Sequence, residues 1–127
     1  MTAVVLDAGA LIELERNDPE MWAVLKLAAL RSVDVHVPST ALAEVWRAMP
    51  TQALLHRALQ HCVIAAFDPL AKSVGELCGH SGTQDICDAH VAIVAVSQGD
   101  VLYTSDPGDL RKLTAQQGKR RPRIVRC

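Results

Sequence analysis

The sequence predicts a three-layer α/β fold, with a central parallel β-sheet of about five strands and helices on both of its faces. Short apolar runs typical of strands alternate with helical segments along the chain, and crossovers between parallel strands are almost always right-handed. Half of the residues are hydrophobic and only 3% are aromatic, which suits helices packed on a sheet. We expect residues 1–127 to form a single domain with its own core.

The N-terminal segment is predicted to contain one strand and two helices. Val4–Leu6 is a short apolar run of strand type. Gly9 permits a tight turn, and a helix is expected over Ala10–Arg16. The dipeptide Asp18-Pro19 is typical of a helix start, with an N-cap followed by proline at the first helical position. Apolar residues then follow at helical spacing over Met21–Leu30.

The middle of the chain is predicted to add two strands and three helices. Val33–Val37 alternates between apolar and polar residues, as a strand does, and Pro38 ends it. Cys62–Ala66 is an apolar run of strand length, and Gly79–Gly82 is expected to be a loop. The helices begin at hydroxyl or proline residues and cover Ser39 or Thr40 to Met49, Pro50 to His61, and Pro69 to about Leu77.

The C-terminal third is predicted to begin with a buried helix. Thr83 can cap this helix, which covers Asp85–Ser97 and ends at Gly99. Because the helix is apolar on nearly every side, it should lie between neighbouring elements. A fourth strand, a helix closed by Gly118 and a short last strand follow, over Val101–Thr104, Pro107–Gln116 and Arg123–Val125.

Two aspartates lie where predicted strands end. Asp7 directly follows the first strand, and Asp106 follows the fourth by one residue. Ligand sites in open α/β sheets lie beyond the carboxyl ends of strands, where the strand order reverses. If these strands are central neighbours, the two carboxylates face each other there and repel unless a cation or a proton lies between them. For Asp7 alone, capping of the following helix is the simpler explanation.

Three further acids occur in unusual surroundings. Asp85 and Asp88 are three residues apart in the first turn of the apolar helix, so both project from one side. The helix dipole accounts for one acid there, whereas two acids at the start of a buried helix suggest that they converge on Asp7. Glu44 lies within the apolar segment 41–46, close to its inward face. A solvated glutamate explains that pattern equally well.

Grouped carboxylates indicate a site for a hard divalent cation. Mg²⁺ and Mn²⁺ prefer oxygen ligands, and such ions activate water for attack on phosphorus. The sequence has no phosphate-binding glycine loop and no conspicuous Ser/His/Asp grouping. Metal-assisted hydrolysis of phosphodiester bonds therefore fits this set of acids best.

Charge is distributed unevenly along the chain. Residues 1–118 carry a net charge of −6, whereas residues 119–127 carry +5. A basic tail beside an acidic body fits an anionic partner such as RNA, although a solvated terminus is the simpler explanation. The candidate RNA-binding residues of the tail are Lys119, Arg120, Arg121 and Arg123.

The cysteines and the apolar runs bear on the compartment. The four cysteines show no CxxC spacing, the N-terminus lacks the basic segment of a signal peptide, and no apolar run approaches the roughly 20 residues that span a bilayer. We expect a reduced, cytoplasmic protein without membrane contact. Cys78, His80, Cys87 and His90 fall within 13 residues, but their spacing matches no common zinc module, and buried free cysteines explain it better.

Four segments together resemble the PIN domain, and in particular the VapC-like toxins of bacterial toxin–antitoxin pairs. They occur in the family's order over essentially the whole chain. Each is weak alone, whereas four at the right spacing are strong evidence. The segments are Val4–Leu11, Ser39–Val45, Asp85–Ala92 and Tyr103–Leu110.

The resemblance assigns roles to individual residues. Asp7, Asp88 and Asp106 match the family's metal-binding aspartates, and Glu44 matches the glutamate of its second motif. Position 9 departs from the pattern, because many relatives carry Ser, Asn or Asp there, whereas Gly9 offers only its backbone. Supporting roles are implied for Asp85, Thr104, Ser105 and Asp109.

The resemblance implies a Mg²⁺- or Mn²⁺-dependent endoribonuclease with a PIN-like fold. It also implies an inhibiting VapB-like antitoxin, which lays a helix in a groove, and a homodimer. Two other interpretations stay open: a non-catalytic PIN-like module that binds RNA or protein, and a receiver-like phosphoacceptor domain, which also carries aspartates at strand ends. The latter needs a lysine at the end of the fifth strand, where this chain has arginines.

Overall fold

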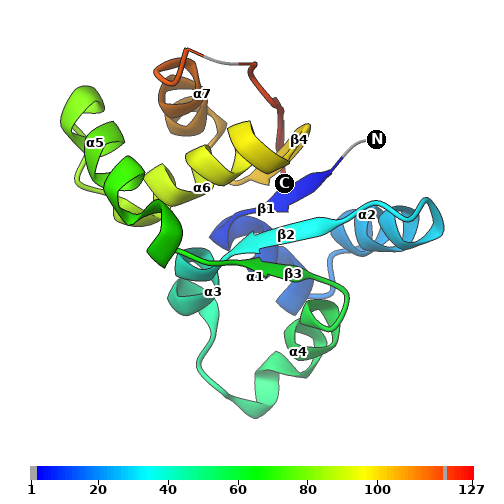
Figure 1. The fold of residues 1–127 in the computed structure, drawn as a ribbon. Coiled ribbons are helices and arrows are strands. Elements are labelled where there is room, and N and C mark those ends of the chain that lie inside the picture. The colour runs from blue at the N-terminus through cyan, green and yellow to red at the C-terminus, as the bar shows by residue number, and fades with distance from the viewer. Residues whose placement is uncertain (1–2, 119) are drawn as a thin grey trace.

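A computed structural model describes residues 3–118 and 120–127 and has a central sheet with helices on both faces (Figure 1). Within this part of the chain the sheet has five parallel strands in the order β3-β2-β1-β4-β5. The class and the number of strands are those predicted from the sequence. The strands are β1 (Val4–Leu6), β2 (Val35–Pro38), β3 (Val63–Ala65), β4 (Val101–Thr104) and β5 (Arg123–Arg126).

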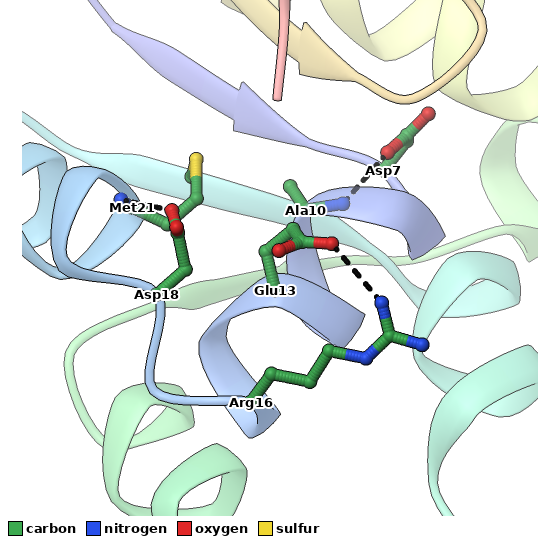
Figure 2. A network of polar contacts seen from close by, with 6 residues as sticks. All are labelled: Asp7, Ala10, Glu13, Arg16, Asp18 and Met21. Atoms are coloured by element: carbon green, nitrogen blue, oxygen red, sulfur yellow. Dashed lines mark hydrogen bonds and ion pairs between the residues drawn. The ribbon is translucent and has the colours of Figure 1, made fainter.

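Helices connect the strands in the predicted order. As expected, Asp18 caps the second helix, because its Oδ2 accepts a 3.0 Å hydrogen bond from the N–H of Met21 (Figure 2). Among the described residues, no helix is long and apolar enough to cross a membrane. The helices are α1 (Ala8–Glu15), α2 (Pro19–Leu30), α3 (Ser39–Val45), α4 (Ala53–Leu59), α5 (Ala71–Ser81), α6 (Ile86–Gln98) and α7 (Pro107–Ala115), with 3₁₀ turns η1 (Pro50–Gln52) and η2 (Asp68–Leu70).

The strand order reverses at the centre of the sheet. From β1 the chain moves outward through β2 to β3, and it then returns through α6 to β4 on the other side of β1 (Figure 1). The register places Leu6 beside Tyr103, so the carboxyl ends of β1 and β4 lie next to each other. Residues that follow these two strands flank the crevice where open α/β sheets bind ligands.

Two apolar cores lie on opposite faces of the sheet. Alternation along β1 turns Val5 toward α5, α6 and α7, and it turns Val4 and Leu6 toward α1, α2 and α4. As predicted, α6 is buried along most of its length, from Cys87 to Val96. Apolar burial contributes roughly 25 cal/mol per Å², and here it fixes the start of α6 beside the crevice.

The end of α3 differs from the prediction. The helix stops at Val45 rather than Met49, because Trp46 is extended and Ala48 has a φ of 56°. The side chain of Gln52 replaces the missing helical hydrogen bonds, since its Oε1 accepts from the N–H of Arg47 (2.8 Å) and its Nε2 donates to the carbonyl of Val45 (2.8 Å). A polar side chain, and not the next helical turn, therefore satisfies this main chain.

The middle helices also have other bounds than predicted. The helix expected over residues 50–61 divides into η1 and α4. The segment 79–82, expected to be a loop, mostly continues α5 to Ser81. Because Leu77 packs into the core against α6, burial outweighs the weak helix propensity of the glycines. The helix ends at Gly82, whose φ of 78° is a left-handed conformation that glycine adopts without strain.

Candidate active site

Asp7 links β1 to α1 at the bottom of the crevice. Its buried carboxylate accepts a 3.1 Å hydrogen bond from the N–H of Ala10 (Figure 2), so α1 begins two residues earlier than predicted. Its own N–H donates to the carbonyl of Tyr103 (3.2 Å). Burial raises the pKa of Asp7, a hydrogen bond from Thr104 opposes the rise, and the charge of Asp106 adds to it. Asp7 is therefore both a helix cap and a neighbour of the second strand-end acid.

Asp106 stands at the start of α7 without capping it. Its N–H donates to the hydroxyl of Thr104 (2.9 Å), whereas its exposed carboxylate makes no capping hydrogen bond. Thr104 is fully buried, and its hydroxyl also meets the carboxylate of Asp7. Thr104 thus holds the ends of β1 and β4 together and leaves the carboxylate of Asp106 unused by the helix.

Three carboxylates meet at this edge of the sheet. One oxygen each from Asp88, Asp106 and Asp109, here called the aspartate trio, lies within 4.8 Å of the others. Asp88 belongs to the first turn of α6, and the other two begin α7. Burial raises the pKa of Asp88 to about 7, with further contributions from the charges of Asp85, Asp7, Asp106 and Asp109. A cation is the natural partner for carboxylates that repel one another in this way.

The two acids in the first turn of α6 have different environments. Asp85 caps the helix, since its Oδ1 accepts a 2.9 Å hydrogen bond from the N–H of Asp88. Thr83, the predicted cap, instead accepts from the N–H of Asp85 (3.1 Å). The helix therefore uses the carboxylate of Asp85, whereas that of Asp88 belongs to the trio.

Glu44 lies outside the aspartate trio. Its side chain on α3 is exposed and borders a depression of about 440 Å³ that Asp85 and Cys87 also line. Burial raises the pKa of the Cys87 thiol, and a hydrogen bond with Glu44 adds to the rise. The structure thus places Glu44 against the start of α6, beside Asp85 and Cys87 and not among the three carboxylates of the trio.

His90 joins α6 to α3 from a fully buried position. Its Nδ1 forms a 2.8 Å hydrogen bond with the hydroxyl of Thr40, and the ring of Phe67 packs edge-on against it. Burial lowers the pKa of His90. Thr40 lies one turn before Glu44, so this bond sets the register of α3 on α6. Sequence reasoning missed this role, for which the available signal was a polar residue within the apolar stretch Ala89–Val96.

The zinc grouping is not supported. Among residues 3–118 and 120–127, the aspartate trio is the one group of three or more potential metal ligands whose atoms lie close together. His90 is engaged with Thr40, and Cys87 is buried as a thiol. Both residues therefore serve the contact between helices.

Gly9 allows the loop between β4 and α7 to approach the start of α1. A Cβ atom at position 9 would lie 2.6 Å from the Cβ of Ser105 and 3.0 Å from its backbone nitrogen. Such contacts are too short to be held, so a side chain would displace the loop that carries Asp106. Gly9 is therefore a packing requirement of this site.

The predicted RNA-binding tail lies away from the crevice. Arg120 forms an ion pair with Asp100, which precedes β4. Arg123 is the first residue of β5 and lies beside the first residue of β4. Arg121 precedes Arg123 by two residues. Lys119 lies outside the described residues. The three described arginines are thus at the amino edge of the sheet, where its strands begin. The aspartate trio lies at the carboxyl edge, where the strands end.

Comparison with solved structures finds the same fold in one chain of a crystal structure of VapBC2 from Rickettsia felis. In that structure the VapBC2 proteins are bound to a DNA fragment from their promoter. The TM-score is 0.69, the identity is 16%, and the match covers 98% of both chains. No family model and no curated protein matches this chain. At this identity the likeness concerns the fold alone, and it confirms the PIN-like architecture predicted from the sequence.

Proposed function

We propose that this protein is a metal-dependent endoribonuclease, the VapC-like toxin of a toxin–antitoxin pair. One observation carries the proposal: carboxylates from α6 and α7 converge beside Asp7 at the point where the strand order reverses. Within the described residues none of these acids has a basic partner at ion-pair distance, because the ion pairs there join Arg16 to Glu13 and Arg120 to Asp100. The fold shared with the VapBC2 chain supports the same assignment.

The residues of the trio fit a hard divalent cation such as Mg²⁺ or Mn²⁺. Carboxylate oxygens within 4.8 Å of one another can share one ion, and both ions favour oxygen ligands. Asp88, Asp106 and Asp109 would hold the ion directly, with Asp7 beside them. A bound cation of this kind lowers the pKa of water and stabilises charge on a leaving oxygen. The raised pKa of Asp88 supports this fit, because a cation would relieve the repulsion that causes part of it.

The other predicted site residues have supporting places in this proposal. Thr104 holds Asp7 and Asp106 in position, and Asp85 sets the orientation of the first turn of α6 through its cap. Glu44 lies on the α3 side, where it can contact substrate or an attacking water from outside the trio. The exposed hydroxyl of Ser105 lies against the start of α1.

The test compares two aspartates that each adjoin a strand. Asp7→Asn should reduce Mg²⁺-dependent cleavage of single-stranded RNA at least about 100-fold, because several kcal/mol of electrostatic stabilisation are at stake. Asp34→Asn is the matched control, since the exposed Asp34 precedes β2 at the amino edge. Cleavage is followed on a labelled RNA with and without EDTA, and circular dichroism verifies folding.

Two results would contradict the nuclease proposal. If Asp7→Asn and the wild type cleave equally, the activity resides elsewhere or in a contaminant. If the wild type binds Mg²⁺ and RNA but never cleaves, the non-catalytic PIN-like module is the better description.

An antitoxin is the proposed protein partner. The Rickettsia felis structure contains a VapBC pair on promoter DNA, and α2 of this chain offers an apolar surface that suits a partner helix. Leu27 and Leu30 are exposed there, and Trp22 borders an apolar depression of about 600 Å³. A homodimer is proposed on the family resemblance. Co-expression with the product of an adjacent reading frame for a small DNA-binding protein should yield a complex that no longer cleaves RNA, and Leu30→Glu should weaken it.

A further inference from the structure

Arg126 brings a positive charge to the edge of the sheet that carries the aspartate trio. It is the last residue of β5 and lies beside Thr104, the last residue of β4. The next residue continues this pairing, since the N–H of Cys127 donates to the carbonyl of Thr104 (3.0 Å). The guanidinium reaches across to the loop before α7, where Nη1 donates to the carbonyl of Ser105 (3.1 Å). The position of Arg126 is therefore fixed by both its backbone and its head group, one residue away from Asp106.

The charge of Arg126 is not neutralised by the part of the chain that the structure describes. The ion pairs found there use other arginines, Arg16 and Arg120, and the side chain of Arg126 is exposed. A guanidinium has five N–H donors, of which one contacts Ser105. The remaining donors are available to an anion from solution.

A polyanion that approaches the trio is repelled by its carboxylates, and a positively charged side chain beside them reduces that repulsion. Arginine suits this task better than lysine, because its planar fork binds two phosphate oxygens at once. The hydrogen bond to Ser105 orients the fork before substrate arrives, which reduces the entropy lost on binding. Arg123, three residues earlier on β5, is about 10 Å away at roughly 3.3 Å per residue and faces the amino edge.

We propose that Arg126 is a substrate-binding residue that holds a backbone phosphate of the RNA next to the phosphate at the aspartate trio. This inference rests on the proposed ribonuclease function. In this inference the residue of the basic tail that contacts RNA is Arg126, at the end of the tail, and not the arginines at its start. Arg126→Ala and Arg123→Ala form a matched pair, since they remove the same charge from the two ends of one strand.

Binding is best measured where cleavage is suppressed. In an Asp7→Asn background with Mg²⁺ present, fluorescence anisotropy gives the affinity for a short labelled single-stranded RNA over a range of salt concentrations. Arg126→Ala should weaken binding about tenfold, the effect of losing one charge-assisted contact. It should also reduce the salt slope by about 0.7, the value for one phosphate of a single strand. Arg126→Lys should recover part of the affinity, and Arg123→Ala should stay within about twofold of its parent.

Steady-state cleavage with otherwise wild-type chains adds a second readout. Arg126→Ala should raise KM about tenfold and leave kcat within about threefold, because the residue binds substrate and does not touch the reacting group. Failure of the wild type to cleave RNA would count against the nuclease function, and the binding comparison would still be decisive for Arg126. Equal binding by the two alanine variants, a larger loss with Arg123→Ala, or no RNA binding by the parent would each overturn the inference.

Discussion

Acidic residues at the two edges of the sheet are in opposite environments. At the amino edge Asp100 precedes β4, and its hydrogen bond with Arg120 holds the pKa of Asp100 below its ordinary value. At the carboxyl edge Asp106 follows the same strand and meets other carboxylates, and the pKa of Asp88 beside it rises to about 7. One strand of four residues thus has a neutralised acid before it and a repelled acid after it.

The difference bears on which edge of the sheet is the better candidate for a ligand site. An acid paired within the protein is satisfied by folding, and an exposed pair of this kind contributes little to stability. Carboxylates that repel one another oppose folding, and such local conflicts are typical of functional sites. The aspartate trio therefore supports the proposal that a cation binds at the carboxyl edge.

The strongest test of the difference between the two edges removes one negative charge from each end of β4. Asp106→Asn should lower Mg²⁺-dependent RNA cleavage about 100- to 1,000-fold, because it takes a charged oxygen away from the proposed cation site. Asp100→Asn should leave cleavage unchanged and lower the melting temperature little, because an exposed ion pair contributes little to stability. Rates on one RNA and melting temperatures for both variants provide the measurement, and equal losses of activity would remove the distinction between the edges.

Much of the carboxyl edge could be predicted because a parallel sheet gathers its strand ends. The apolar runs that become β1 and β4 are easy to find, and placing them side by side brings Asp7 and Asp106 together without knowledge of any side chain. The buried α6 followed from its apolar sequence in the same way. The fold class and the position of the crevice thus depend on patterns several residues long.

The details that could not be predicted depend on single side-chain contacts. Spacing placed Asp85 and Asp88 on one side of α6, but only the capping hydrogen bond shows that the helix uses the former. The resemblance implies only a supporting role for Asp109, because nothing in the sequence shows that the first turn of α7 brings its carboxylate close to that of Asp88. The basic residues of the tail are close together in the sequence. However, β5 runs parallel to β4 from the amino edge of the sheet to its carboxyl edge, so Arg123 and Arg126 lie at opposite ends of the strand.

A second prediction concerns how closely the carboxyl edge is packed. Gly9→Ala places a Cβ atom against Ser105 and should displace the loop that carries Asp106. Overpacking of this kind costs about 1–3 kcal/mol, and we expect Mg²⁺ affinity to fall about tenfold as the carboxylates move apart. Isothermal titration calorimetry with Mg²⁺ measures this directly, without reference to catalysis.

Two controls separate this packing effect from a general loss of order. Gly108→Ala changes a glycine in the first turn of α7 that has no heavy atom within 4 Å of an added Cβ, so Mg²⁺ affinity should not change. Adding Ser105→Gly to Gly9→Ala removes the side-chain part of the clash and should restore part of the affinity. If the double variant binds Mg²⁺ no better than Gly9→Ala, contact with Ser105 is not what makes Gly9 necessary.

The smallest expected effect is on the stability of the metal-free protein, and its sign distinguishes repulsion from pairing. The pKa of Asp88 is about 7 in the folded chain, against an ordinary value of 3.8. Between these values the folded state holds the proton more tightly than the unfolded state, so stability decreases as the pH rises through this window. Asp88→Asn cannot ionise, and in EDTA at pH 8 it should melt a few degrees above the wild type, with the difference vanishing near pH 4.

Comparing the wild type with Asp88→Asn separates the effect of Asp88 ionisation on stability from that of His90 protonation. Burial lowers the pKa of His90 below 6.5, so protonation in the unfolded state reduces stability as the pH falls below that value. The histidine is present in both proteins, and its contribution cancels in the difference between their melting temperatures. Mg²⁺ should then reverse the order at pH 8, because the wild type gains binding energy that the variant lacks. A wild type more stable than Asp88→Asn in EDTA would mean that Asp88 is paired within the chain, as Asp100 is, and that the two edges do not differ.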